Sequence, residues 1–278
     1  MKLNSNPHLK LQEINLKNLL ATGAFQFANE TTPWFPYTSG QVGPYYFQST
    51  TIEKDGKAYA TAIQSLAELI QADAAPFDVI SGGETRDWDF SNPVAVALRK
   101  PHLKLYKDGK ALGADVAGRN VLHVADLNNE GSSIRDYWKP HIEKNGGRVV
   151  GFVSFVDRLE DGVAVLKKLG IPALSVAPLD EHAWDLTLRE GCISRAVHQA
   201  LVERMRDKRA WALRTLRAHP DFFRKLYRNP ATQAKALKIM QTYPEIRGEL
   251  EAIIKLGRRS GNFYNDISHK KAQDSQGG

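Results

Sequence analysis

The chain has 278 residues, of which 42% are hydrophobic and 25% charged, as in a soluble globular protein with one large or two modest domains. Its single cysteine, Cys192, excludes an intramolecular disulfide framework and fits a reducing compartment. No segment approaches the roughly 18 apolar residues of a membrane span, and the first residues lack the apolar core of a signal peptide. A cytoplasmic protein with no membrane partner is therefore expected.

The net charge of +7 is unevenly distributed along the chain. From Leu201 to the end, 17 Lys and Arg residues stand against 8 Asp and Glu residues, which gives +9. The remainder has 21 against 23, which leaves −2. The basic excess thus belongs to the C-terminal third, and the split predicts a boundary near Ala200.

Helical patterns and short apolar runs alternate along the first two thirds of the chain. After a helix over Pro7–Thr22, an aromatic, turn-rich segment predicts short strands, and an amphipathic helix follows over Lys57–Ala72. The later strands expected are 77–80, 103–106, 121–124, 148–156 and 171–176, with helices starting at Pro93 and covering 134–145 and 163–169. This alternation predicts an α/β fold with a doubly wound, mainly parallel sheet.

The stretch Arg119–Tyr137 has the features of a phosphate site. A buried strand over Val121–Val124 is followed by Asp126, then by a polar turn with Gly131, Ser132 and Ser133, and then by a helix. Backbone N–H groups at a helix N-terminus attract anions, and serine hydroxyls can add donors. Ligands of open α/β folds bind at the carboxyl ends of such strands. The alternative interpretation is an ordinary strand-to-helix turn.

This turn resembles the phosphoribosyl-pyrophosphate motif of the type I phosphoribosyltransferases. That motif is a hydrophobic strand, two acidic residues and a loop rich in Thr, Ser and Gly. Asp126 matches the second acid, whereas Ala125 stands in place of the first, and Asn129-Glu130 replace small or hydroxyl residues. The resemblance implies that Asp126 holds the ribose hydroxyls and that a group of loop residues holds the 5′-phosphate, namely Asn129, Gly131, Ser132 and Ser133.

A more specific match follows the next strand. The series Val-Asp-Arg-x-Glu-x-Gly over Val156–Gly162, then a helix and Gly-Ile-Pro at Gly170–Pro172, is similar to orotate phosphoribosyltransferases. The resemblance, which covers about Gly23–Leu179, implies that Arg158 meets the ring of the base. The alternative is a surface salt bridge from Arg158 to Glu160 or Asp161.

The aromatic segment resembles the N-terminal hood of the same family. The pair Tyr46-Phe47 matches aromatic residues that lie against the flat pyrimidine, while the basic residues of the preceding turn are replaced by Thr38 and Gln41. The alternative for Tyr46 and Phe47 is a hydrophobic strand that fills the core.

Two further segments resemble parts that bind pyrophosphate. Arg86 follows the glycine turn at the basic position of the family's pyrophosphate loop. Lys107 and Lys110 match two lysines of a mobile loop that closes over the reacting centre, and the alternative is that both are ordinary solvated lysines. The chain departs from the pattern by an insertion, Asp87–Ser91, before the expected helix start. Its acids are unfavourable beside polyphosphate unless they hold Mg²⁺, and a bland surface loop is the alternative. Tyr106 also replaces an arginine, and the loop histidine is missing.

From about Glu190 the chain reads as short helices separated by prolines, over 193–216, 221–228, 231–242 and 245–256. A cluster of aromatic and basic residues around Phe222–Arg228 could bind phosphates or nucleic acid. A packed aromatic face beside a solvated basic face is favoured over nucleic-acid binding. The last residues, 260–278, are polar and expected to be disordered.

These patterns together predict an orotate phosphoribosyltransferase-like α/β domain with a hood over residues 1–190, a basic helical subdomain over 191–259 and a tail. The resemblance implies an enzyme that uses Mg²⁺ and transfers phosphoribose from phosphoribosyl pyrophosphate to a pyrimidine-like base. It also implies a homodimer. The alternative is a catalytically inactive relative that binds a nucleotide and acts through the basic helical region.

Overall fold

The structure, a computed structural model, describes residues 8–255, which form two compact units. The first contains residues 8–26 and 47–194, and the second contains residues 27–46 and 195–255. The second boundary lies close to the predicted division at residues 190 and 191. The hood segment differs from the prediction, because most of it belongs to the unit of the C-terminal helices. The predicted tail, 260–278, lies outside the described residues.

The first unit is built on a six-stranded sheet with the strand order β10-β9-β8-β5-β6-β7. All neighbouring strands are parallel except β6 and β7, which form an antiparallel pair. The strands are β5 (Val79–Gly83), β6 (His102–Leu105), β7 (Ala111–Gly113), β8 (Asn120–Asn128), β9 (Arg148–Asp157) and β10 (Ala173–Pro178). The predicted α/β fold with a mainly parallel sheet is confirmed.

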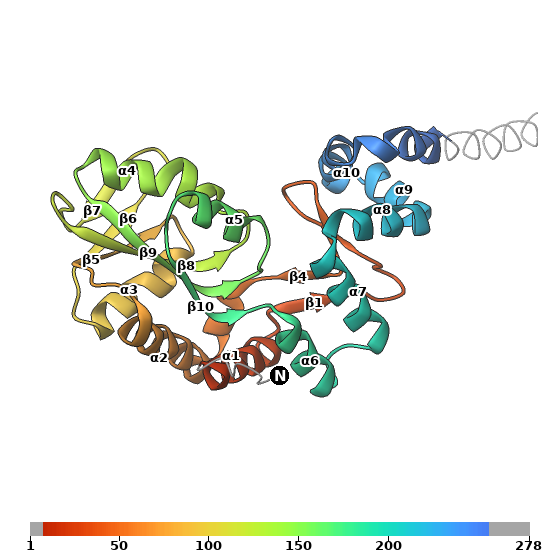
Figure 1. The fold of residues 1–278 in the computed structure, drawn as a ribbon. Helices are drawn as coiled ribbons and strands as arrows, with labels where there is room; N and C mark the ends of the chain where they lie inside the picture. Colours follow the sequence, from red (N-terminus) through yellow and green to blue (C-terminus); the bar gives the residue numbers. More distant parts are fainter. Residues whose placement is uncertain (1–7, 256–278) are drawn as a thin grey trace, which may run out of the picture. The chain divides into compact units, whose positions relative to one another are not determined.

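Helices cover both faces of this sheet (Figure 1). On one side lie α1 (Leu9–Ala21), α2 (Gly56–Asp73) and α3 (Asp87–Ala97), with the short 3-10 helix η1 (Ser49–Lys54) before α2. On the other lie α4 (Lys139–Lys144) and α5 (Asp161–Lys168). An apolar core between the second set and the sheet includes Ala125, Trp138 and Phe152. Burial of this face explains the near-continuous apolar runs of the strands.

The strand order reverses between β5 and β8. From β5 the chain adds β6 and β7 on one side, and from β8 it adds β9 and β10 on the other. The two strands pair in parallel, with Ser81 opposite His123. Ligands of doubly wound folds bind beyond the carboxyl ends of the strands at such a switch point. The topology therefore predicts a binding site at the carboxyl ends of β5 and β8.

Helix α3 begins earlier than predicted. It starts at Asp87, so the segment Asp87–Ser91 is helical rather than a surface loop, and Pro93 lies inside the helix. Proline has no N–H, which leaves the carbonyl oxygen four residues earlier, on Asp89, without its helical donor. The Tyr59 hydroxyl of α2 donates a hydrogen bond to that oxygen. A tertiary contact therefore compensates for the proline.

We expect Tyr59→Phe to lower the free energy of unfolding by about 1–2 kcal/mol, because it leaves the Asp89 carbonyl without a donor while retaining the ring. Burial raises the pKa of Tyr59 to about 12, so the hydroxyl keeps its proton over the usual pH range. Urea denaturation of the variant measures the loss. A second variant that also replaces Pro93 with Ala should recover part of it, and equal losses in both backgrounds would contradict this account.

Two other elements differ from the pattern-based prediction. Strand β8 continues through Asn128, so Asp126 lies within the strand rather than in the turn after it. The helix predicted over 134–145 starts with a π-helical segment, η2 (Ile134–Trp138), before α4. Pro140 lies at the start of α4, and its missing N–H and its ring disturb the regular bonding of the preceding turn.

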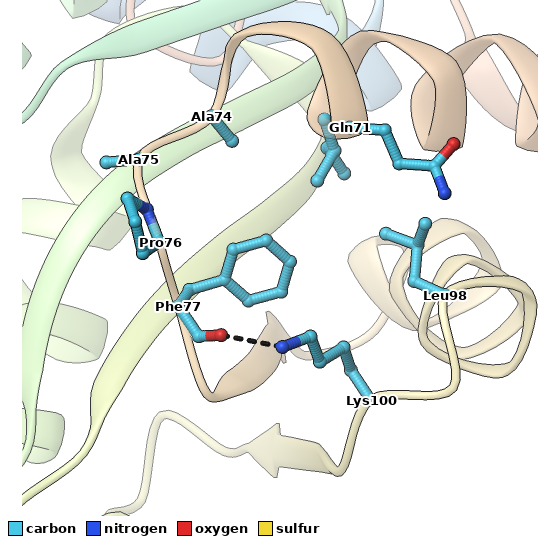
Figure 2. Close-up of a pocket in the computed structure, with 8 residues that line it drawn as sticks. Gln71, Ala74, Ala75, Pro76, Phe77, Leu98 and Lys100 are labelled. Atoms are coloured by element: carbon cyan, nitrogen blue, oxygen red, sulfur yellow. Dashed lines mark hydrogen bonds between the residues drawn. The ribbon is translucent and has the colours of Figure 1, made fainter.

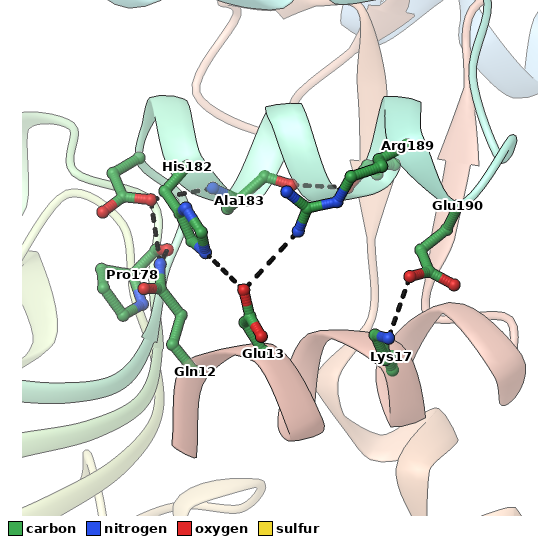
Figure 3. A network of polar contacts seen from close by, with 10 residues as sticks. Gln12, Glu13, Lys17, Pro178, His182, Ala183, Arg189 and Glu190 are labelled. Atoms are coloured by element: carbon green, nitrogen blue, oxygen red, sulfur yellow. Dashed lines mark hydrogen bonds and ion pairs between the residues drawn. The ribbon is translucent and has the colours of Figure 1, made fainter. Parts of the chain in front are cut away.

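Helix α6 (Glu181–Arg189) was not predicted, and polar contacts join it to α1 (Figure 3). The Oε1 atom of Glu13, in α1, lies 3.0 Å from His182 Nε2 and 3.6 Å from a guanidinium nitrogen of Arg189. Lys17 pairs with Glu190 at 2.9 Å. These contacts hold α6 against α1.

The second unit combines a hairpin with a series of helices. Strands β2 (Phe35–Pro36) and β3 (Val42–Gly43) form the hairpin. The division between the two units falls within β1 (Phe25–Phe27) and β4 (Tyr45–Phe47), which pair with each other. The helices are α7 (Arg195–Arg206), α8 (Lys208–Ala218), α9 (Pro220–Arg228) and α10 (Pro230–Thr242); η3 (Pro244–Ile246) and helical residues 247–255 follow. The helix predicted over 193–216 is interrupted at Asp207, whose side chain accepts hydrogen bonds from two N–H groups of α8.

The hairpin is part of the apolar core of this unit, which explains why it groups with the helices. Trp34 and Val42 are fully buried among residues of α8, α9 and α10, and Trp34 packs edge-on against Phe222 with centroids 4.8 Å apart. Buried Arg204 of α7 donates a hydrogen bond to the Val42 carbonyl oxygen at 3.0 Å. The aromatic residues of the predicted basic-aromatic cluster are thus packed inward, as the favoured interpretation expected.

Candidate functional site

Asp126 lies at the carboxyl end of β8, beside the switch point, and is only 8% exposed. The Ser49 hydroxyl donates a hydrogen bond to its carboxylate oxygen Oδ2. Burial, and after it the neighbouring Asp87 carboxylate, raise the pKa of Asp126 to about 8, although the Ser49 hydrogen bond lowers it. A carboxyl group with a strongly perturbed pKa at the end of a parallel strand is typical of a functional site.

Asp87 joins the ends of the two strands at the switch point. Its Oδ2 accepts a hydrogen bond from the Gly83 N–H at 3.0 Å, and its Oδ1 accepts one from the Asp126 N–H at 3.1 Å. The side chain therefore connects the glycine turn after β5 with the motif strand β8. This role of Asp87, which lies in the predicted insertion, was not predicted from the sequence.

The turn after β8 carries the residues that were predicted to hold a phosphate. Asn129, Ser132 and Ser133 are half-buried, and among the described residues none of their side chains has a hydrogen-bond partner. Gly131 adopts a φ of +64°, and a Cβ there would lie 3.0 Å from Val165. Both features favour glycine. The loop thus presents hydroxyl donors and the N–H groups of a helix start at the carboxyl edge of the sheet.

Arg158 follows β9 at the same edge and is 8% exposed. Its guanidinium lies 3.1 Å from Glu160 Oε1, so the alternative ion pair is present, although it is buried rather than on the surface. The preceding residue, Asp157, accepts hydrogen bonds from Asn128 Nδ2 at 2.9 Å and from the Leu159 N–H at 2.7 Å. These contacts fix the start of the turn that carries Arg158.

The basic residues predicted to meet pyrophosphate are exposed at this edge. Arg86 precedes α3 and, within the described part of the chain, makes no ion pair. Lys107 and Lys110 lie in the tight turn between β6 and β7, where the Lys107 N–H donates to Glu84 Oε1 at 3.1 Å. Their ammonium groups lie 5.9 Å from the Tyr137 ring centroid and 5.3 Å from that of Tyr106, respectively. The predicted mobile loop is therefore a short hairpin turn.

The two aromatic candidates differ in their surroundings. Phe47, at the end of β4, is buried in the first unit with its ring centroid 4.9 Å from that of Phe25. This packing is that of a core residue. Tyr46 belongs to the second unit, where it is half-buried with its ring centroid 6.4 Å from that of Phe35.

A further set of side chains around Asp126 and Asp87 was not predicted from the sequence. They are Ser49 and the buried His123, whose Nδ1 lies 2.9 Å from the Ser81 hydroxyl. Asp87 was noted in the sequence as an acid of the insertion. Its position in the sequence did not show that its carboxylate would point towards Gly83 and Asp126. No sequence signal distinguished Ser49 from other serines.

The residues present fit a Mg²⁺ ion carried by a polyphosphate better than one held by the protein. In the range 8–255, no three His, Cys, Asp or Glu side chains are placed to hold a metal ion. Both oxygens of Asp87 accept backbone N–H groups. Mg²⁺ in phosphate sites commonly keeps several waters and binds through the phosphates with one or two carboxylates. The residues at this edge thus fit a Mg²⁺ ion that enters the site bound to the phosphates of a ligand.

Other features lie away from this edge. A pocket of about 330 Å³ is lined by Phe77, Leu98 and Lys100, which precede β5 and β6 at the opposite end of the strands (Figure 2). Lys100 Nζ donates a hydrogen bond to the Phe77 carbonyl oxygen at 2.8 Å, so the ammonium group already has a partner in the wall of the pocket. Over residues 8–255, no helix has the length and apolar character needed to cross a membrane.

Comparison with known proteins shows the family of the chain. The chain is 31% identical over 153 residues to an orotate phosphoribosyltransferase of Sulfolobus acidocaldarius, a match that covers 53% of this chain and 76% of the relative. The chain belongs to the orotate phosphoribosyltransferase family. No family model matches the chain.

Solved structures of orotate phosphoribosyltransferases have the same fold. The enzyme from Francisella tularensis matches with a TM-score of 0.58 and 18% identity over 69% of this chain and 96% of that one. The enzyme from Aeropyrum pernix matches with a TM-score of 0.54 and 24% identity over 64% of this chain and 99% of that one. The predicted family and fold are thereby confirmed, while the roles of individual residues stay predictions.

Proposed function

We propose that the protein is a phosphoribosyltransferase that transfers phosphoribose from phosphoribosyl pyrophosphate, with Mg²⁺, to a pyrimidine-like base. The observation that carries the proposal is the placement of Asp126, the Asn129–Ser133 loop and Arg158 at one carboxyl edge of the sheet, beside the switch point. Membership of the orotate phosphoribosyltransferase family supports it, and orotate is the first acceptor to test.

The proposed reaction displaces pyrophosphate from C1 of the ribose by a ring nitrogen of the base. The C1–oxygen bond breaks as the C1–nitrogen bond forms, the bonding electrons leave with pyrophosphate, and the ribose ring passes through an oxocarbenium-like state. Catalysis therefore depends on positioning the two reactants and stabilising the departing anion more than on a strong nucleophile. Mg²⁺, when bound, would neutralise part of the pyrophosphate charge.

Each part of the site has a role in this proposal. The Asp126 carboxylate accepts hydrogen bonds from the ribose hydroxyls, and the loop hydroxyls and N–H groups bind the 5′-phosphate. Arg86, Lys107 and Lys110 place positive charge near the pyrophosphate. Arg158, at the same edge of the sheet, meets the base.

Arg158→Ala tests the base side of the proposal. We expect the wild-type protein to release pyrophosphate from phosphoribosyl pyrophosphate in the presence of Mg²⁺ and orotate, with loss of the ultraviolet absorbance of orotate. The variant should lose on the order of 10²-fold in kcat/KM, since a buried charged contact to the base is removed. Binding of phosphoribosyl pyrophosphate by calorimetry should change little in the same variant, which separates the two halves of the site.

A second candidate is a catalytically inactive family member that retains ligand binding. The observations that favour it are Ala125 in place of the first motif acid and Thr38 and Gln41 in place of the basic hood residues. Such a protein would bind phosphoribosyl pyrophosphate without pyrophosphate release with any base of a panel. Turnover with one base of the panel would exclude it.

A further inference from the structure

The Asp87 carboxylate occupies a particular place in the fold, between the carboxyl ends of β5 and β8. Its two oxygens each accept one backbone N–H, from Gly83 at 3.0 Å and from Asp126 at 3.1 Å. These strands are the neighbours between which the strand order reverses. One side chain therefore fixes the glycine turn and the motif strand relative to each other.

We propose that Asp87 is a positioning residue for the phosphoribosyl site, which holds the glycine turn after β5 and Asp126 of β8 in the geometry that binds a ribose 5-phosphate with an anionic leaving group. The proposal rests on the proposed function for the identity of the ligand. It goes further by assigning a role to a residue that lies outside the family's motif and within the added segment.

The packing around β8 explains why this acid comes from α3 rather than from the strand. Ala125 is 3% exposed and belongs to the apolar core with Trp138 and Phe152. A carboxylate at position 125 would be buried there, at a large cost in free energy unless it were paired. Asp87, by contrast, stands in the first turn of α3, where the helix dipole stabilises a negative charge.

A buried histidine supports the Asp87 carboxylate from within the sheet. His123 Nε2 lies 3.5 Å from Asp87 Oδ2, and His123 Nδ1 lies 2.9 Å from the Ser81 hydroxyl on β5. The ring is fully buried and stacks on Phe152 with centroids 5.6 Å apart. Because the ring is held on both sides, it limits the positions that the Asp87 carboxylate can take.

The same contact gives Asp87 an electrostatic effect on Asp126. The groups that face Asp126 are the Ser49 hydroxyl from η1 and the side chains of Arg86 and Asp87 at the start of α3. Burial is the largest cause of the raised pKa of Asp126, and the negative charge of Asp87 is the second largest. Removing that charge should lower this pKa, so that the Asp126 carboxylate forms at a lower pH.

Asp87→Asn tests the proposal, with Asp89→Asn as the matched control. Both variants remove one negative charge from the first turn of α3, but the Asp89 carboxylate accepts neither of the two N–H groups. Phosphoribosyl pyrophosphate with Mg²⁺ is titrated into each full-length protein by calorimetry from pH 5 to pH 9. We expect the Asp87 variant to bind about 10- to 100-fold more weakly at its optimum, as displaced site residues generally cause.

The pH profile separates positioning from a general loss of stability. On the acid side of the profile, affinity rises with pH as Asp126 loses its proton. In Asp87→Asn the pH midpoint of this rise should move to a lower value, whereas in Asp89→Asn both the affinity and this midpoint should stay near those of the wild type. Unchanged affinity in Asp87→Asn would overturn the proposal. Weaker binding with an unmoved midpoint would also overturn it, since a loss that is merely structural leaves the pKa of Asp126 in place.

A second measurement keeps this proposal separate from the proposed function. If the wild-type protein binds no phosphoribosyl pyrophosphate, the proposed function fails, and amide hydrogen exchange of the ligand-free protein decides on Asp87. An Asn side chain has one oxygen, so at least one of the Gly83 and Asp126 N–H groups loses its acceptor and should exchange faster than in Asp89→Asn. Equal exchange at both amides in the two variants would overturn the role of Asp87 without reference to any ligand.

Discussion

Asp126→Asn is expected to lower kcat/KM on the order of 10²-fold and, at the same time, to stabilise the fold at alkaline pH. Under the proposed function, the loss of activity follows from removing a charged acceptor beside the ribose, where positive charge develops. The gain in stability follows from burial, since the wild-type carboxylate is 8% exposed and lies beside Asp87. Residues that bind ligand at the expense of stability are common at functional sites.

The sign of the pH dependence follows from the pKa of Asp126, which burial raises to about 8, whereas an unfolded aspartate has a pKa of about 3.9. The folded protein binds this proton more tightly than the unfolded chain does. The stabilising contribution is therefore fully present below about pH 4 and is lost as the pH rises towards 8. At pH 8 the neutral Asn variant should be more stable than wild type by roughly 1–3 kcal/mol.

Urea denaturation at pH 4.5 and pH 8 measures both limits of this prediction. The difference between variant and wild type should be small at the acidic pH and large at the alkaline pH. Ser49→Ala is a suitable control, because it removes the hydrogen bond to the carboxylate and should destabilise the protein at pH 8, the opposite direction. A variant no more stable than wild type at pH 8 would show that the Asp126 charge is fully compensated in the fold.

Trp34→Ala is expected to have the largest effect on stability, a loss of about 3–5 kcal/mol in the second unit. Trp34 is fully buried in the core of that unit and packs edge-on against Phe222. Its removal leaves a cavity between the β2–β3 hairpin and the helices. Hydrogen exchange of amides in α9 and α10 during mild denaturation locates the loss in this unit.

The matched control for Trp34 is Leu237→Ala in α10, because Leu237 belongs to the same unit but is 45% exposed. This control should change stability by no more than about 0.5 kcal/mol. If Trp34→Ala left exchange in α9 and α10 unchanged, the hairpin would not be an integral part of the helical core. The result also bears on truncation near Ala200, which would remove the helices that bury Trp34 and so expose the hairpin.

The sequence by itself determined the sheet, the motif loop and the family. Alternating helical and apolar patterns predicted the parallel strands, because strands buried on both faces need nearly continuous apolar runs. Local chemistry predicted the turn after Asp126, since a glycine with positive φ and hydroxyl residues at a helix start depend on the nearest residues alone. The Val156–Gly162 motif predicted the family through its resemblance to orotate phosphoribosyltransferases.

Only the tertiary structure decided which distant side chains meet at the site and in the second unit. The partnership of Asp87 with Gly83 and Asp126 depends on where α3 begins, and that start became possible because Tyr59 of another helix supplies the donor that Pro93 lacks. Trp34 likewise joins the core of helices that follow it by more than 170 residues. Such contacts are set by packing between elements, because periodicity states which face of a segment is apolar but not which other segment covers that face.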